Sequence, residues 1–171
     1  TLISLSIGQG ELLATPMQMA NLAAAIANRG YYYTPHIVKQ IKGESIPEKF
    51  NIKHYTSIDS NHFETIIEGM EMVLEDIEGS AFSSRVTNLS ICGKTGTAQN
   101  PKGEDHSIFI AFAPKKDPQI AIAVYVENGG YGKDWAAPIA TLMIEYYLKN
   151  GEITNKNLEK EMMNGNLLNR K

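Results

Sequence analysis

The stretch Ser90–Gln99, SICGKTGTAQ, contains two overlapping motifs, and the choice between them decides the fold. Gly93-Lys94-Thr95 could end a phosphate-binding loop, whereas Lys94-Thr95-Gly96 could lie on an exposed strand that binds an anionic substrate. The two interpretations require different structures, because a phosphate-binding loop leads directly into a helix. The residues on either side of the stretch therefore decide between them.

The phosphate-loop interpretation fails at several positions. The pattern G-x-x-x-x-G-K-[ST] needs a glycine at position 88, where the chain has Asn88. The intervening residues 89–92, Leu-Ser-Ile-Cys, are too bulky and apolar to wrap a phosphate with backbone N–H groups. Gly96, Asn100 and Pro101 then discourage the helix that must follow. The region Leu89–Gln99 is therefore predicted to be a strand.

As a strand, this region carries small and polar side chains that suit a binding edge. Side chains alternate along a strand, so Thr95 and Thr97 share one face while Lys94 and Gly96 share the other. Two hydroxyls on one face can bind a substrate carboxylate, and the Lys94 ammonium adds positive potential nearby. Gly96 leaves room for an acyl group against the backbone, and a backbone N–H at such an edge can stabilise an oxyanion. A three-residue pattern is common, so an ordinary surface strand stays open as an alternative.

The flanking segments predict a mixed structure of helices and antiparallel strands. Two nearly continuous apolar runs, Ile108–Ala113 and Ile120–Val126, are typical of strands buried on both faces. The short polar turn between them predicts a hairpin. A helix is predicted over residues 134–148, and an extended, edge-like segment over Tyr31–Ile41. The fold class is therefore α+β, with an antiparallel sheet flanked by helices.

The first long helix is predicted from a strong start signal. Thr15 can cap it, and Pro16 suits its first position. The residues Met17–Ala27 are apolar around most of the helix circumference, so the helix should be buried. Gly30 suits the left-handed position that follows the helix end.

A second helix is predicted from a stripe of apolar residues at helical spacing. It should begin at Ser60 or Asn61, with Glu64 completing a capping box, and end at Gly79. The apolar stripe consists of Phe63, Ile66, Ile67, Met70, Val73, Leu74 and Ile77.

The amino-acid composition and net charge of the chain argue against some functional classes. The chain has 171 residues, of which 43% are hydrophobic and 20% charged, as expected for one ordinary globular domain. The net charge of −3 offers no basic excess for nucleic acid, so no nucleic-acid partner is expected. No apolar run approaches the ~20 residues of a membrane-spanning helix. Because the chain opens at Thr1 without a signal-like stretch, any membrane anchor or export signal is expected upstream.

Other reactive side chains have simpler interpretations. Cys92 is the only cysteine, and its apolar flank favours a small core residue over a nucleophile. His106 could serve a different hydrolase, but its position at the start of a strand favours a structural role. The four histidines show no metal-ligand spacing, so no metal and no cofactor are expected.

A series of short blocks runs through the chain in a recognisable order. They are SIGQG (Ser6–Gly10), ATPMQMA (Ala14–Ala20), NRG (Asn28–Gly30), GSA (Gly79–Ala81), GKTGTAQ (Gly93–Gln99), HSIFIAFAP (His106–Pro114), VEN (Val126–Asn128) and AAPI (Ala136–Ile139). These blocks resemble the transpeptidase domains of class B penicillin-binding proteins, most of all those of the elongation type.

The resemblance implies a peptidoglycan D,D-transpeptidase. In that family a serine attacks the penultimate D-alanine carbonyl of a stem peptide, D-alanine leaves, and an amine of a neighbouring stem resolves the acyl-enzyme into a cross-link. β-Lactams mimic D-Ala-D-Ala and trap the same serine. The resemblance implies that Lys94 is catalytic, that Lys94, Thr95, Gly96 and Thr97 bind substrate, and that the Thr97 backbone N–H is an oxyanion donor.

The resemblance also implies where the whole protein works. The full-length protein is expected at the cytoplasmic membrane, with its catalytic domain on the outer, periplasmic face. A membrane glycosyltransferase of the elongation machinery is the expected protein partner.

Two motifs of the family are missing from this sequence. The nucleophile belongs to S-x-x-K and a second serine to S-x-N, yet no serine here has Lys three residues on or Asn two residues on. Both motifs normally precede the SIGQG block. Residues 1–148 are therefore expected to be the C-terminal half of a β-lactamase/transpeptidase-like domain, and residues 149–171 a polar tail, frayed or forming a short surface helix. By itself the chain is expected to form no acyl-enzyme with a fluorescent penicillin.

The sequence leaves other functional classes open. A non-catalytic penicillin-recognising sensor or partner-docking module could use the same fold without turnover. A D,D-carboxypeptidase or β-lactamase is a nearer alternative, which the SIGQG, GKTGTAQ and FIAFAP blocks disfavour. The presence of S-x-x-K and S-x-N in the parent protein would distinguish a transpeptidase from a sensor.

Overall fold

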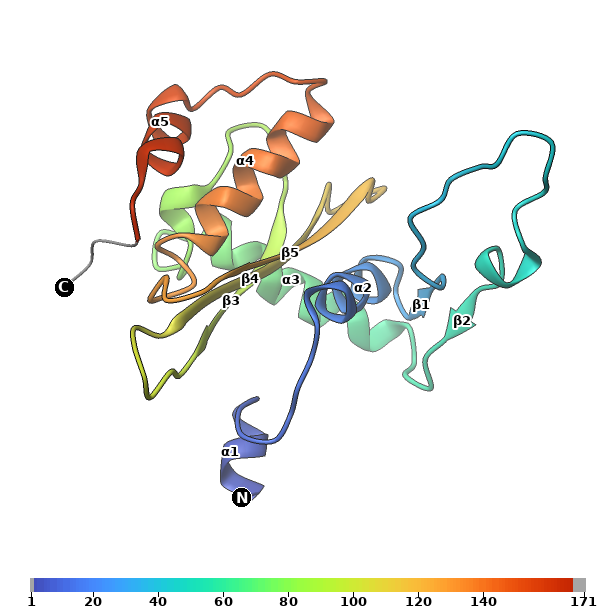
Figure 1. The fold of residues 1–171 in the computed structure, drawn as a ribbon, viewed down its shortest axis with the longest axis horizontal. Coiled ribbons are helices and arrows are strands. Elements are labelled where there is room, and N and C mark those ends of the chain that lie inside the picture. The colour runs from blue at the N-terminus through green and yellow to red at the C-terminus, as the bar shows by residue number, and fades with distance from the viewer. Residues whose placement is uncertain (1, 168–171) are drawn as a thin grey trace.

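The structure is a computed structural model that describes residues 2–167 (Figure 1). Residue 1 and residues 168–171 lie outside the described residues. The first residue of the expected segment 1–148 and the last four residues of the expected segment 149–171 are therefore not described. Outside the main sheet, the helices and strands are α1 (Leu2–Ser6), α2 (Pro16–Ala27), β1 (Tyr31–Tyr32), η1 (Glu48–Phe50), β2 (His54–Tyr55), α3 (Asn61–Glu75), η2 (Phe82–Ser84), α4 (Ala136–Leu148) and α5 (Lys156–Asn164).

The main sheet has three antiparallel strands. These are β3 (Cys92–Ala98), β4 (His106–Ala113) and β5 (Ile120–Val126), in that spatial order. The register places Thr95 of β3 opposite Phe109 of β4. The predicted hairpin and the α+β class are therefore confirmed.

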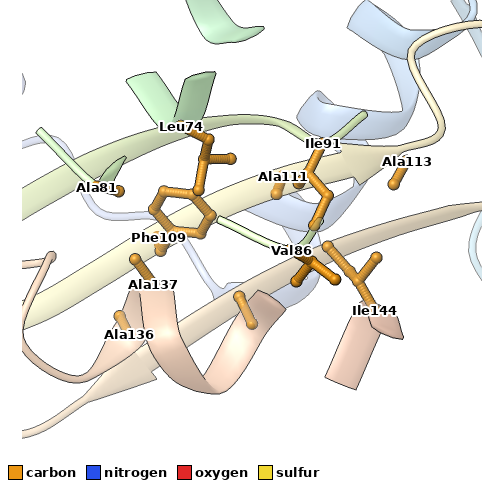
Figure 2. Packing of buried hydrophobic residues seen from close by; sticks show 11 residues of the cluster. Leu74, Ala81, Val86, Ile91, Phe109, Ala111, Ala113, Ala136, Ala137 and Ile144 are labelled. Atoms are coloured by element: carbon orange, nitrogen blue, oxygen red, sulfur yellow. The ribbon is translucent and has the colours of Figure 1, made fainter. Parts of the chain in front are cut away.

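Helices cover the two faces of this sheet. Figure 1 shows α4 on one side of the sheet and α2 with α3 on the other. The α4 side holds the larger buried cluster, where Phe109 packs among Leu74, Ala81 and Ala137 (Figure 2). The opposite side holds a smaller cluster of Ala27, Phe63, Ile67, Met70, Cys92 and Phe112. Because β4 is buried on both faces, its near-continuous apolar sequence is explained.

The fit between β3 and β4 depends on one glycine. Gly93 lies next to the fully buried ring of Phe109, and a Cβ on Gly93 would lie 2.7 Å from Cε1 of that ring. Real Cβ atoms do not approach carbon this closely, so any larger residue must displace the ring or the strand. Gly93 therefore lets Phe109 fill the core beneath the edge strand.

The expectation that α2 is buried is wrong for much of the helix. Its capping box is present, because the Gln18 N–H donates to the Thr15 hydroxyl and the Gln18 side chain accepts from the Thr15 N–H. Only Ala23, Ala25 and Ala27 are buried, however, whereas Met17 is 55% exposed. The exposed residues of α2 are those of its first turn, Pro16–Gln18, and Leu22.

The end of α2 also differs in detail from the prediction. The left-handed residue after the C-cap is Arg29, with φ of 56°, and Gly30 follows with φ of 108°. The Gly30 N–H donates to the Ala25 carbonyl, and the Arg29 N–H donates to that of Ile26, a Schellman arrangement. A left-handed arginine is unfavourable, and a 2.8 Å ion pair to Glu64 on α3 holds its side chain in place.

The α3 helix keeps its predicted stripe but has different ends. Ser60 makes no capping hydrogen bond, and the Asp59 carboxylate accepts from the Asn61 N–H at 2.9 Å instead. Glu64 pairs with Arg29 rather than completing a capping box. The helix ends at Glu75, four residues before the predicted Gly79. Phe63, Ile67, Met70 and Leu74 of the stripe are buried, whereas Ile66 and Ile77 are exposed.

Residues 31–57 form an arm that projects from the main body (Figure 1). The expected extended segment over Tyr31–Ile41 is a strand only at β1, where Tyr31 pairs with Tyr55 of β2. Aromatic contacts support this short ribbon, because the Tyr31 ring lies 5.9 Å from that of Tyr55. Only two residues pair on each side, so the arm contributes little to the sheet that carries the candidate site.

Hydrogen bonds to the buried carboxylate of Glu145 hold the segment after α4 in place. Glu145 is fully buried and accepts hydrogen bonds from the Lys149 ammonium and from the backbone and hydroxyl of Thr154. Burial favours the neutral acid, but these hydrogen bonds outweigh it and hold the pKa of Glu145 below its usual value. The short surface helix α5 follows this anchor and contains no buried residue.

We expect Gly93→Ala to destabilise the fold. The added methyl must displace the fully buried Phe109 ring, so the free energy of unfolding should fall by about 1–3 kcal/mol, the usual cost of overpacking a core. Thermal or urea unfolding of the purified protein measures the change. Gly69→Ala is the matched control, since a Cβ there meets no atom within 4 Å and alanine favours a helix. Equal stability of the two variants would contradict the packing argument.

Candidate active site

The residues that the sequence singled out lie on the edge strand of the sheet. Within residues 2–167, β3 pairs with β4 on one side and with no strand on the other. Lys94 is exposed, and Thr95, Gly96 and Thr97 are partly exposed. The unpaired edge of β3 therefore offers backbone groups and polar side chains to a ligand.

The side chains of β3 alternate as predicted. Thr95 and Thr97 lie opposite Phe109 and Ser107 of β4, which places both hydroxyls on the α4 side of the sheet. Lys94 starts from the other face, but its ammonium turns back to the Thr95 carbonyl at 2.9 Å. The positive charge and the two hydroxyls therefore come together within four consecutive residues, Lys94–Thr97.

Thr95 also contacts a residue from outside the strand. The hydroxyl of Ser80, in the turn after α3, lies 3.0 Å from the Thr95 hydroxyl. In the sequence, Ser80 stands out only as part of the GSA block. The contact joins positions 15 residues apart, and only the folded chain brings them together.

The loop before α4 packs directly on the backbone of β3. A Cβ on Gly132 would lie 2.6 Å from the Gly96 carbonyl oxygen and 3.0 Å from the Gly96 nitrogen, and it would overlap the Ile108 carbonyl oxygen. Only glycine can approach two strands this closely. No pattern in the sequence indicates this contact, because Gly96 and Gly132 are 36 positions apart.

Ser107 holds this loop in place. Its hydroxyl is fully buried, donates to the Tyr131 carbonyl at 2.8 Å and accepts from the Ala136 N–H at 3.0 Å. Since Ser107 lies opposite Thr97, the loop is anchored beside the exposed part of β3. The first residue of α4 and the edge strand are thus fixed relative to each other.

A polar network joins the two loops at the far end of β3. The Asn100 amide donates to the Asn128 side-chain oxygen at 2.8 Å, and the Asn100 N–H donates to Asp105 at 3.1 Å. The Asn128 N–H donates to Nδ1 of His106, whose ring packs 5.4 Å from that of Tyr125. These contacts agree with the structural role favoured for His106.

The start of the stretch is anchored on α3. Glu71 accepts from the Ser90 hydroxyl at 3.1 Å and from the Lys115 ammonium at 2.6 Å. The hydrogen bond to Glu71 raises the pKa of Lys115. Cys92 is fully buried next to this pair, and its burial raises the pKa of the thiol to about 12. Cys92 is therefore a core residue, as predicted, and carries almost no thiolate at neutral pH.

Two other kinds of site find no support here. Gly93-Lys94-Thr95 lies inside a strand that continues into a turn, so the exclusion of a phosphate-binding loop is confirmed. Residues 2–167 hold no group of three or more His, Cys, Asp or Glu side chains placed to bind a metal ion. Among the same residues, no helix is long and apolar enough to cross a membrane.

Comparison with known proteins identifies the family. The family described as penicillin binding protein transpeptidase domain matches residues 2–145. The chain belongs to this family. The peptidoglycan D,D-transpeptidase MrdA of Haemophilus influenzae is 34% identical over an alignment of 167 residues that covers 85% of this chain and 25% of that protein. The chain therefore spans about a quarter of this curated relative.

Solved penicillin-binding proteins share the fold. PBP2 of Pseudomonas aeruginosa, in complex with WCK 5153, is 34% identical with a TM-score of 0.76, over 89% of this chain and 34% of that one. Penicillin-binding protein A of M. tuberculosis, solved as an imipenem acyl-enzyme complex, is 32% identical with a TM-score of 0.68, over 85% of this chain and 33% of that one. The resemblance noted in the sequence blocks is therefore confirmed.

We expect Gly132→Ala to impair the candidate site. The methyl group must push the loop away from Gly96 and Ile108, which shifts the exposed part of β3. If the full-length protein is acylated by a fluorescent penicillin, as the family implies, the rate of acylation should fall about 10²-fold, the usual effect of misplacing functional groups by ~1 Å. Gly69→Ala again serves as the control, because it adds the same methyl in open space. Unchanged acylation of the Gly132 variant would contradict the positioning role of the loop.

Proposed function

We propose that the full-length protein containing this chain is a peptidoglycan D,D-transpeptidase that works through a serine acyl-enzyme. The observation that carries the proposal is the exposed edge strand with Lys94-Thr95-Gly96-Thr97, in a family whose curated members include D,D-transpeptidases. Residues 1–148 would supply the C-terminal part of the transpeptidase domain, and residues 149–171 a polar tail. The nucleophilic serine would come from a part of the protein outside this sequence.

The proposed reaction has two steps. The serine oxygen attacks the penultimate D-alanine carbonyl of a stem peptide, the peptide bond breaks, and the terminal D-alanine leaves with a proton on its new amine. An amine from a second stem peptide then attacks the ester, forms the cross-link and releases the serine. β-Lactams resemble D-Ala-D-Ala and would stop at the acyl-enzyme, as in the imipenem complex of the M. tuberculosis relative.

The residues of this chain would bind the donor peptide and stabilise charge. The hydroxyls of Thr95 and Thr97 share one face and can donate to the terminal carboxylate of the donor. Lys94 is exposed beside them and supplies positive potential where that carboxylate and the tetrahedral oxyanion carry negative charge. The Thr97 backbone N–H would be one oxyanion donor, and Gly96 would leave space for the acyl chain.

The cellular setting forms part of the same proposal. The full-length protein would be held at the cytoplasmic membrane by a segment outside this sequence, with the transpeptidase domain on the outer face. Its substrate would be the peptidoglycan stem peptide, and its protein partner a membrane glycosyltransferase that makes the glycan strands.

Substitution of Lys94 tests the proposal. In the full-length protein, Lys94→Ala should lower the rate of acylation by a fluorescent penicillin about 10²-fold, the scale of losing one preorganised electrostatic contact. Lys102→Ala removes another exposed lysine, in the β3–β4 loop, and should leave the rate unchanged. Acylation without cross-linking of stem peptides would instead indicate a penicillin-recognising sensor. Wild-type acylation rates in the Lys94 variant would contradict the proposed role of β3.

A further inference from the structure

The backbone around Ser80 is held rigidly against α3. A Cβ on the preceding Gly79 would lie 2.6 Å from the Val73 carbonyl oxygen, so this turn packs closely on the last part of the helix. The Ala81 N–H donates to the same Val73 carbonyl at 2.9 Å, and the Ala81 side chain is buried in the main core. Ser80 is therefore a fixed point beside the edge strand rather than part of a loose loop.

The side chain of Ser80 points from this turn to Thr95. The two hydroxyl oxygens are 3.0 Å apart, and Ser80 is exposed while Thr95 is partly exposed. The Thr95 carbonyl accepts from the Lys94 ammonium at 2.9 Å. Thr95 is thus contacted at its backbone by a cation and at its side chain by a hydroxyl, both at the surface.

The direction of the hydroxyl pair matters for binding an anion. Each hydroxyl carries one proton and accepts through two lone pairs. If Thr95 donates its proton to a carboxylate, its oxygen can only accept from Ser80, so Ser80 must be the donor in the pair. The resulting chain runs from Ser80 to Thr95 to the anion, and each hydrogen bond polarises the next.

We propose that Ser80 is a positioning residue for carboxylate recognition: it donates to the Thr95 hydroxyl and thereby directs the Thr95 proton at the ligand. This inference rests on the proposed function, in which Thr95 binds the carboxylate of the donor peptide or of a β-lactam. Without Ser80, the Thr95 hydroxyl loses the neighbour that orients it and can rotate away from the ligand. Ser80 itself touches neither the reacting carbonyl nor the nucleophile.

The test uses the full-length protein and a fluorescent penicillin that carries the carboxylate. Ser80→Ala should lower the second-order rate constant of acylation about tenfold, the scale of one hydrogen bond that supports a charged ligand. The loss should appear in the concentration needed for half-maximal acylation, and the limiting rate at saturation should stay unchanged. Ser80→Thr keeps the hydroxyl and should retain most of the wild-type rate.

A double-mutant cycle separates positioning from simple structural damage. In a Thr95→Val background, Ser80→Ala should cause no further loss, because the group that it orients is gone. A structural role would lower the melting temperature and reduce acylation in both backgrounds alike. Equal losses in the two backgrounds, or failure of Ser80→Thr to restore the rate, would overturn the inference.

The outcomes also distinguish this inference from the proposed function. If the wild-type protein is not acylated, the proposed function and the role of Ser80 fail together. If it is acylated but Lys94→Ala has no effect, the proposed role of β3 fails, and the role of Ser80 fails with it. If the wild type is acylated and depends on Lys94 but Ser80→Ala reacts normally, only the role of Ser80 fails.

Discussion

The contact between Phe109 and Gly93 fixes the position of the edge strand, and the candidate site depends on it. The Phe109 ring fills the core under β3, and only a residue without a side chain leaves room for it there. A shift of β3 by one residue would bring Lys94 or Cys92 to that place and move every side chain to the opposite face. The Phe109 contact therefore determines which side chains of β3 reach the exposed edge.

A binding edge also has a cost in stability, and the structure shows how that cost is contained. An unpaired strand edge invites pairing with other chains, and the two glycines of β3 weaken it further. The strand is supported from three directions: by Glu71 at its start, by Ser80 at Thr95 and by Gly132 on the Gly96 backbone. The exposed Lys94 adds a charge, which discourages pairing at the edge. The support leaves the polar groups accessible while keeping the strand rigid.

Local patterns in the sequence were sufficient to predict the strands of the main sheet, including the edge strand β3, and the long helices α2, α3 and α4. β5 has the boundaries that its apolar run predicts, whereas β4 starts two residues early because its pairing with β3 extends to His106. The contacts of Ser80 and Gly132 could not be predicted, since each joins residues distant in sequence. The burial of α2 was predicted wrongly, because an all-apolar helix does not reveal how many of its sides are covered within residues 2–167.

The central claim is that β3 binds the carboxylate of a D-Ala-D-Ala-like ligand. A crystal structure of the full-length protein acylated by a penicillin tests it most directly. The account predicts the penicillin carboxylate within ~2.7–3.2 Å of the Thr95 and Thr97 hydroxyls, with the Lys94 ammonium close by. A penicillin that is covalently attached but has its carboxylate away from β3 would contradict it.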